Sequence, residues 1–307
     1  MVKRANNKAK KVKYGLPDRI LYCFIVVFLL LVSVLMLYPI INVVAISFSA
    51  YTEYVKAPWM ILPKGFTTEA YSIVLKNLSF WRSYSNSIFI VIWHVVLSLF
   101  VTITFAWAMS RRELKCKVFV MYIVIFCMIF SAGLVPSYLN VDELGLNGTL
   151  WALILPRLFS SFNTIIMLNF FKGLPYELVE AAMIDGASEP FILRKIVVPL
   201  STPVIASITL FLAVGAWNNY FSAQIYLPFN EELWPMSLML KEMLGRTVAS
   251  LLESGGDPAA IAEAQNTISQ KIMQYACLVI ATVPMMMIYP FLQKYFAKGV
   301  MVGSVKG

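Results

Sequence analysis

The chain has 307 residues, of which 60% are hydrophobic and only 13% charged, and its mean hydropathy is +0.75. An ordinary soluble domain carries about 25% charged residues, so this composition excludes a water-soluble globular protein. One histidine and four scattered cysteines supply no zinc-type ligand set, and we expect no metal site. The net charge of +9 arises at the chain ends and in short loops without interleaved aromatic residues, which argues against a nucleic-acid partner. The remaining class is a protein embedded in lipid.

Six runs with almost no charge are each long enough to cross a bilayer as a helix, which takes about 20 apolar residues. Continuous apolar runs favour helices over barrel strands, in which apolar and polar residues alternate. The first run is longer than the apolar stretch of a signal peptide, about 7 to 15 residues, so we expect no cleavage there. The sequence therefore predicts an all-α membrane protein with six spans, at residues 20–41, 83–109, 118–139, 144–171, 200–228 and 272–292.

The basic residues are distributed unequally between the two sides of these spans. Most of the 25 lysines and arginines lie in four segments, residues 1–19, 110–117, 172–199 and 293–307. Because basic residues gather in cytoplasmic loops, both termini are expected in the cytoplasm.

No internal repeat or low-complexity linker divides the chain. We therefore expect one membrane domain over residues 20–292, between an N-terminal tail at 1–19 and a C-terminal tail at 293–307. Two long loops then lie outside the cell, at about 42–82 and 229–271.

The cytoplasmic segment 172–199 contains residues that are typical of the starts and ends of two short helices. Pro175 suits the start of the first helix, and Gly186 suits the left-handed position that ends it. Ser188 is a candidate cap for a second helix, which we expect Pro199 to stop because the residue before a proline avoids the α region. The segment thus predicts a helix, a turn and a helix outside the membrane.

Both predicted helices present apolar side chains that no neighbouring loop is large enough to cover. We expect a groove in a partner protein to cover them. They are Leu178, Ala181, Ala182, Phe191, Ile192 and Ile196.

In this segment Glu180-Ala181-Ala182 is followed by Asp185-Gly186-Ala187 and then by Ile196-Val197-Val198-Pro199. This spacing resembles the EAA loop of ATP-binding-cassette (ABC) importer permeases. The resemblance extends over the whole chain, and it is closest to the maltose-permease type of carbohydrate uptake system, in the branch that handles complex oligosaccharides. A type I importer fold with cytoplasmic EAA coupling helices is therefore implied. The matching residues, which the resemblance implies couple transport to ATP hydrolysis, are Glu180, Ala181, Ala182, Asp185, Gly186, Ala187, Ile196 and Pro199.

The resemblance also implies the partners. They are a second, different permease subunit, two ATPase subunits and an external solute-binding lipoprotein, all at a bacterial cytoplasmic membrane. The chain has no phosphate-binding Gly-x-x-x-x-Gly-Lys-Ser/Thr loop, so we expect it not to be an enzyme. ATP and Mg²⁺ are then bound by the partner ATPases, and this chain holds no cofactor.

Candidate contacts for an oligosaccharide come from two spans. Arg157 is the single charge inside a span; it suits either an anionic sugar or pairing with the second permease and with carbonyls freed by Pro156. Aromatic and amide side chains in the fifth span suit sugar binding, but helix packing explains them as well. These fifth-span candidates are Trp217, Asn218, Asn219, Tyr220 and Gln224.

Several alternatives stay open. The nearest alternative is a permease of an ABC importer that carries amino acids or peptides. A self-contained secondary transporter is a weaker alternative, because no inverted repeat and no acidic residue in a span is evident. The loop at 241–269 resembles, by position alone, the loop that in maltose-type relatives enters the binding protein. The identity, linkage and charge of the sugar are not encoded in any motif of the chain.

Overall fold

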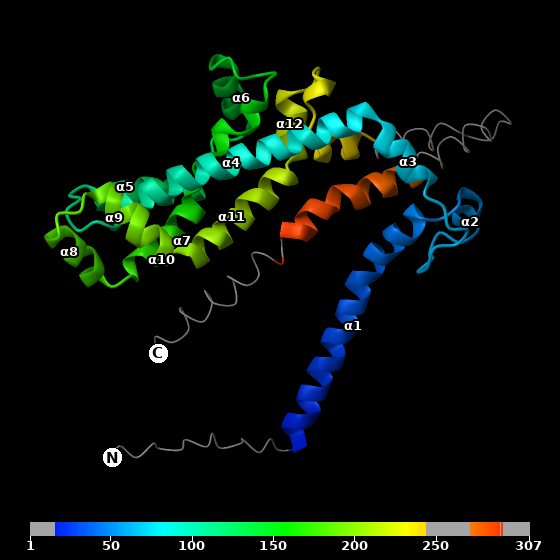
Figure 1. Cartoon of the computed structure of the whole chain (residues 1–307), viewed down its shortest axis with the longest axis horizontal. Helices are drawn as coiled ribbons and strands as arrows, with labels where there is room; N and C mark the ends of the chain where they lie inside the picture. The colour runs from blue at the N-terminus through cyan, green and yellow to red at the C-terminus, as the bar shows by residue number, and fades with distance from the viewer. Residues whose placement is uncertain (1–15, 244–270, 289, 291–307) are drawn as a thin grey trace. The chain divides into compact units, whose positions relative to one another are not determined.

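The computed structural model describes residues 16–243, 271–288 and 290, and every regular element among these residues is a helix. The chain divides into two compact units, Met1–Thr68 and Glu69–Gly307, which are described separately. The predicted tails and the external loop at 241–269 fall almost entirely outside the described residues. Figure 1 shows the elements along the chain.

The first unit contains α1 (Leu16–Ser47) and the short α2 (Tyr51–Lys56). The helix α1 continues well beyond residue 41, where the predicted span ends. Asn42 holds the loop that follows, because its side-chain amide donates hydrogen bonds to the carbonyls of Met60 at 2.8 Å and Pro58 at 3.1 Å.

The second unit contains the remaining elements. They are α3 (Glu69–Lys76), α4 (Leu78–Ser110), α5 (Lys117–Ile129), α6 (Leu134–Glu143), η1 (Leu150–Leu153), η2 (Leu155–Arg157), α7 (Ser161–Lys172), α8 (Tyr176–Ile184), α9 (Glu189–Ile192), η3 (Leu193–Val197), α10 (Val198–Leu200), α11 (Thr202–Trp217), α12 (Tyr220–Tyr226), η4 (Glu231–Leu233), a helix at 236–243 and a last helix at Lys271–Ile288.

The long helix α4 is the centre of this unit, and α7 and α11 pack along it (Figure 1). One face of α4 carries a buried residue at about every fourth position, and most of these residues are small. Small side chains let helix backbones approach closely where lipid supplies no hydrophobic driving force. The face consists of Ser83, Ser87, Ile90, His94, Ser98, Thr102 and Ala106.

Several predicted spans are not single straight helices. Three described helices are individually long and apolar enough to cross a membrane, namely Pro17–Ser47, Leu78–Ser110 and Lys271–Ile288. Three further helix pairs pass only when each bent pair is taken as one span. The expected run at 118–139 bends by 113° between α5 and α6, where Gly133 adopts a φ of +83°. Hydropathy could not predict this bend, because it indicates whether a segment lies in lipid or in water and not the direction in which the helix runs.

The fourth and fifth predicted runs are interrupted as well. The run at 144–171 contains η1, η2 and α7 with a bend of 47°, and the run at 200–228 is split into α11 and α12 at Asn218 and Asn219. Polar residues that cap helices stand at these breaks, because they satisfy the backbone groups that a helix end leaves free.

Candidate functional site

The first helix of segment 172–199 folds as its punctuation predicts. Pro175 precedes α8, and Gly186 follows its end with a φ of +79°. The amide of Gly186 donates to the carbonyl of Met183 at 3.0 Å, and the amide of Ala187 donates to that of Ala182 at 2.9 Å. This pair of bonds is the Schellman motif, which needs a residue in the left-handed region at Gly186.

The second helix differs from the prediction in two ways. The Ser188 hydroxyl makes no capping hydrogen bond, and the helical path does not stop at Pro199 but continues to Leu200. A π-helical stretch, η3, lies immediately before Pro199. Its wider turn removes the need for the amide hydrogen that proline lacks, so the proline is tolerated inside a continuous helical path.

Three side chains anchor this helix–turn–helix to the rest of the unit. Val179 is 6% exposed, Ile192 0% and Val197 1%, and they join a core with residues of α4, α7 and α11. The expectation that Ile192 faces a partner is therefore wrong. Leu178 and Phe191 are exposed, as expected for partner contacts.

The turn between the two helices borders an open groove of about 520 Å³. Five residues of the predicted coupling set line it, namely Ala182, Asp185, Gly186, Ala187 and Ile196. Glu180, Ala181 and Pro199 are exposed and lie outside its lining. The structure thus brings most of the predicted set to one surface, whose role in coupling stays a prediction.

Sequence reasoning missed the arginine that ties this segment to α4. The Arg111 guanidinium is almost buried and lies 2.8 Å from Oε1 of Glu189, the first residue of α9. The other oxygen of that carboxylate accepts a hydrogen bond from Nε1 of Trp107 at 3.1 Å. Arg111 also lies over the Trp107 ring, 5.1 Å from its centroid, and 3.6 Å from Glu113. One carboxylate therefore joins α9 to two side chains at the end of α4.

A second set of contacts fixes the start of α8. The Arg112 guanidinium stacks 4.2 Å from the ring centroid of Tyr176, whose hydroxyl donates to Glu113 at 3.4 Å. The backbone amide of Glu113 itself, together with Arg111, Tyr176 and Arg112, holds the pKa of this carboxyl below its usual range. Glu113 thus stays ionised at neutral pH. The sequence did hold one signal for both sets of contacts. Charged residues follow directly after the apolar helix α4, which ends near Trp107.

The polar cluster predicted in the fifth span stands at the break between α11 and α12. Trp217 is the last residue of α11; its ring is 7% exposed and packs edge-on against Tyr84, with centroids 5.9 Å apart. Within this chain, Trp217 therefore packs between helices and presents no free ring face for a sugar.

The other members of the cluster are more accessible. Asn219 caps α12, since its side-chain oxygen accepts from the amide of Ser222 at 3.4 Å. Asn218, Tyr220 and Gln224 are exposed. These three side chains remain candidates for contact with a transported molecule or with a second subunit.

Arg157 ends the short 3-10 helix η2 and is exposed in this chain. Among the described residues it has no carboxylate partner. It lies close enough to the buried His94 of α4 to interact electrostatically with it. The only intramembrane arginine identified from the sequence is thus available to an anion from outside the chain.

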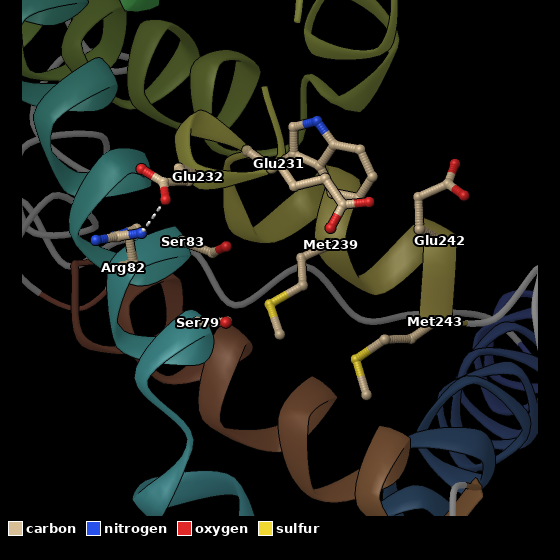
Figure 2. Close-up of a pocket in the computed structure, with 9 residues that line it drawn as sticks. Ser79, Arg82, Ser83, Glu231, Glu232, Met239, Glu242 and Met243 are labelled. Carbon is tan, nitrogen blue, oxygen red and sulfur yellow. Dashed lines mark ion pairs between the residues drawn. The ribbon is translucent and has the colours of Figure 1, made fainter. Parts of the chain in front are cut away.

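A pocket of about 340 Å³ lies at the opposite end of α4 from segment 172–199. Figure 2 shows its acidic side, where Glu231, Glu232 and Glu242 surround the space and Arg82 pairs with Glu232 at 3.1 Å. Among the described residues, no three or more His, Cys, Asp or Glu side chains are arranged so that they could hold a metal ion.

The described residues thus form an all-helical arrangement in which an anchored helix–turn–helix packs against one end of α4. No family model matches the chain. Protein LplC of Bacillus subtilis is 41% identical over 90% of this chain and 91% of the relative. The polygalacturonan/rhamnogalacturonan transport system permease protein YtcP of the same organism is 37% identical over 96% of this chain and 100% of the relative.

Solved structures agree with these relatives. A bacterial ABC transporter involved in the import of the acidic polysaccharide alginate matches with a TM-score of 0.82 and 32% identity, over 93% of this chain and 100% of that chain. A second alginate transporter chain, at 14% identity and a TM-score of 0.54, supports the fold alone.

The chain belongs to the family of carbohydrate-uptake ABC importer permeases. The family resemblance deduced from the sequence is confirmed, and so is the expectation of a membrane transport subunit that is not an enzyme. The roles of individual residues are not tested by these comparisons.

Proposed function

We propose that the chain is the permease subunit of an ATP-driven importer of oligosaccharides and forms the translocation pathway with a second permease. The observation that carries this proposal is the full-length similarity to a permease named for polygalacturonan and rhamnogalacturonan transport. The other named relatives include permeases for arabinooligosaccharides and for trehalose and maltose. These names favour a sugar substrate over an amino acid or a peptide.

The proposed topology has six spans with both termini in the cytoplasm. Three continuous helices and three bent pairs are compatible with it. The basic loop that contains Arg111 and Arg112 packs against the coupling segment, so the two most basic internal loops lie at the same end of the unit. Positive residues favour the cytoplasmic side, which supports the proposal that this end faces the cytoplasm.

In the proposed mechanism, the helix–turn–helix at 172–200 docks into a groove of an ATPase subunit. Two ATPase subunits bind ATP and Mg²⁺ and close on nucleotide binding, and a solute-binding lipoprotein delivers the sugar from outside. A short helix pair that is rigidly anchored through Val179 and Ile192 passes a rigid-body motion to the spans instead of absorbing it.

The proposal is tested by the contribution of Glu180 to ATPase binding. Glu180 is exposed on α8 and has no ion-pair partner among the described residues. If it meets a basic side chain of the ATPase, Glu180→Gln should weaken association about tenfold or more, because the partner charge is left unpaired. Affinity is measured by titrating purified ATPase onto the permease pair in nanodiscs.

The matched control is Glu177→Gln, one turn earlier on the same helix, which should change the affinity by less than about twofold. Equal affinities for wild type and both variants would contradict docking through α8. Failure of the wild-type pair to import any oligosaccharide with the ATPase and lipoprotein present would contradict the proposed function itself.

We further propose that the imported oligosaccharide is acidic. One relative is named for polygalacturonan transport. The solved structure that matches with a TM-score of 0.82 belongs to a transporter involved in the import of an acidic polysaccharide. Arg157 supplies a cation with no carboxylate partner among the described residues. An arginine in a span is costly unless a negative group meets it, and a uronate carboxylate is such a group.

Arg157→Gln should therefore reduce uptake of an acidic oligosaccharide about tenfold or more while leaving a neutral one unchanged, since a charge-assisted hydrogen bond contributes about 1.5–3 kcal/mol. The measurement is initial uptake of oligogalacturonide and of a neutral oligosaccharide of equal length into proteoliposomes. Equal effects on both sugars would show that Arg157 serves packing or subunit pairing.

A further inference from the structure

Two pockets lie side by side at the end of α4 that bears the coupling segment, and they share Lys117 and Lys172. The first, of about 240 Å³, has a mixed lining in which Arg112 and Tyr176 add to the two lysines, and it is called the polar pocket below for these groups. The second, of about 280 Å³, is lined by apolar side chains and a tyrosine, namely Met109, Val118, Met121 and Tyr122. A basic cavity thus opens directly beside an apolar groove.

The polar pocket carries uncompensated positive charge. Arg111, which also lines it, is neutralised by Glu113 and Glu189. Lys117, Lys172 and Arg112 have no carboxylate within ion-pair distance among the described residues. Bringing such cations together without a counter-ion is unfavourable, so the pocket is complementary to an anion.

The apolar groove is lined by residues at the start of α5, where the predicted third span begins. Lys117 is the first residue of α5, and Lys172 is the last residue of α7. Along α5, Val118, Met121 and Tyr122 come directly after Lys117, and Val118 and Tyr122 are more than half exposed. A lysine at a helix end with apolar residues on the next turn marks the boundary between headgroups and hydrocarbon.

We propose that these two pockets form one binding site for an anionic phospholipid. Its phosphate lies among Lys117, Lys172 and Arg112, and one acyl chain covers the groove over Val118 and Met121. Basic pockets between spans on the cytoplasmic side bind anionic headgroups, which the proposed orientation of the chain matches. A zwitterionic lipid is disfavoured because its ammonium group brings a further cation to the pocket.

The site has a consequence for the coupling segment. Arg112 stacks on Tyr176, which is the first residue of α8. A phosphate that holds Arg112 therefore restrains the start of the first coupling helix. This inference goes beyond the proposed function, since it assigns a ligand that is not transported.

The test is native mass spectrometry of the assembled importer released from vesicles that contain equal parts of phosphatidylglycerol and phosphatidylcholine. The wild-type complex should retain phosphatidylglycerol, and the double variant Lys117→Gln with Lys172→Gln should retain about tenfold less. The control removes the same charge from exposed lysines outside both pockets, through Lys76→Gln with Lys115→Gln, and should behave as wild type.

A second variant separates charge from folding. Lys117→Arg with Lys172→Arg keeps both charges and should keep the lipid, so equal loss in the glutamine and arginine variants would overturn the proposal. Displacement of the lipid by 10-fold excess inorganic phosphate would assign a soluble anion to the site, and a wild-type complex without bound phosphatidylglycerol would reject it. Co-purification of the ATPase is measured on the same samples, so a loss of assembly is distinguished from a loss of lipid.

Discussion

Gly186→Val should uncouple sugar import from ATP hydrolysis while the importer still assembles. Gly186 has a φ of +79°, and a Cβ atom added there meets nothing within 4 Å. The cost of a side chain is therefore conformational and not steric, about 1–2 kcal/mol for a non-glycine residue in the left-handed region and more for a branched one. The Schellman bonds break first, and the relative direction of α8 and α9 changes.

We expect the rate of import to fall about tenfold or more, in line with that conformational cost. The measurement is the rate of import and of ATP hydrolysis in the same proteoliposomes. Asparagine tolerates the left-handed region, so Gly186→Asn should retain most of the coupling.

The chain offers a matched control for this substitution. Gly145 ends α6 with the same pair of bonds, from its own amide to Asp142 and from Leu146 to Val141, at a φ of +66° and with the same open space. Gly145→Val should cost the same strain without uncoupling. If both valine variants lower coupling equally, the effect is a general loss of stability and Gly186 has no special role.

Arg111→Met should raise the number of ATP molecules hydrolysed per sugar several-fold. The substitution removes the ion pair between Arg111 and Glu189 and leaves the hydrogen bond from Trp107 as the remaining described link between Glu189 and the end of α4. Glu189 is about half exposed, so water solvates the freed carboxylate and the loss is about 1–2 kcal/mol, below the value for a fully buried pair. The helix α9 is then held to α4 more weakly, so part of its motion is expected to be lost before it reaches α4.

The ratio is measured as ATP hydrolysed against sugar accumulated in proteoliposomes. Arg111→Lys keeps the charge but not the planar contacts and should fall between wild type and Arg111→Met. Lys115→Met, in the same loop without an ion pair among the described residues, should leave the ratio unchanged. An unchanged ratio in Arg111→Met would show that the ion pair between Arg111 and Glu189 does not contribute to coupling.

Local signals in the sequence predicted the bounds of the first helix of segment 172–199. Pro175 and Gly186 restrict or permit particular backbone angles whatever the rest of the chain does. The contact between Arg111 and Glu189 was not predictable in this way, since it joins residues far apart in the chain. Hydropathy did not predict the bend near Gly133 or the end of α11 at Asn218, because an apolar run continues across each of them. Whether Trp217 packs or binds depends on Tyr84, which a single sequence does not place beside it.

The π-helical stretch before Pro199 has a mechanical consequence. Because the helical path is unbroken from Glu189 to Leu200 and then turns by 82° into α11 at the buried Ser201, the two arms form a crank. A displacement along the path from Glu189 to Leu200 is therefore expected to move α11 sideways. A small movement at the cytoplasmic end would then change the position of α11 within the plane of the bilayer.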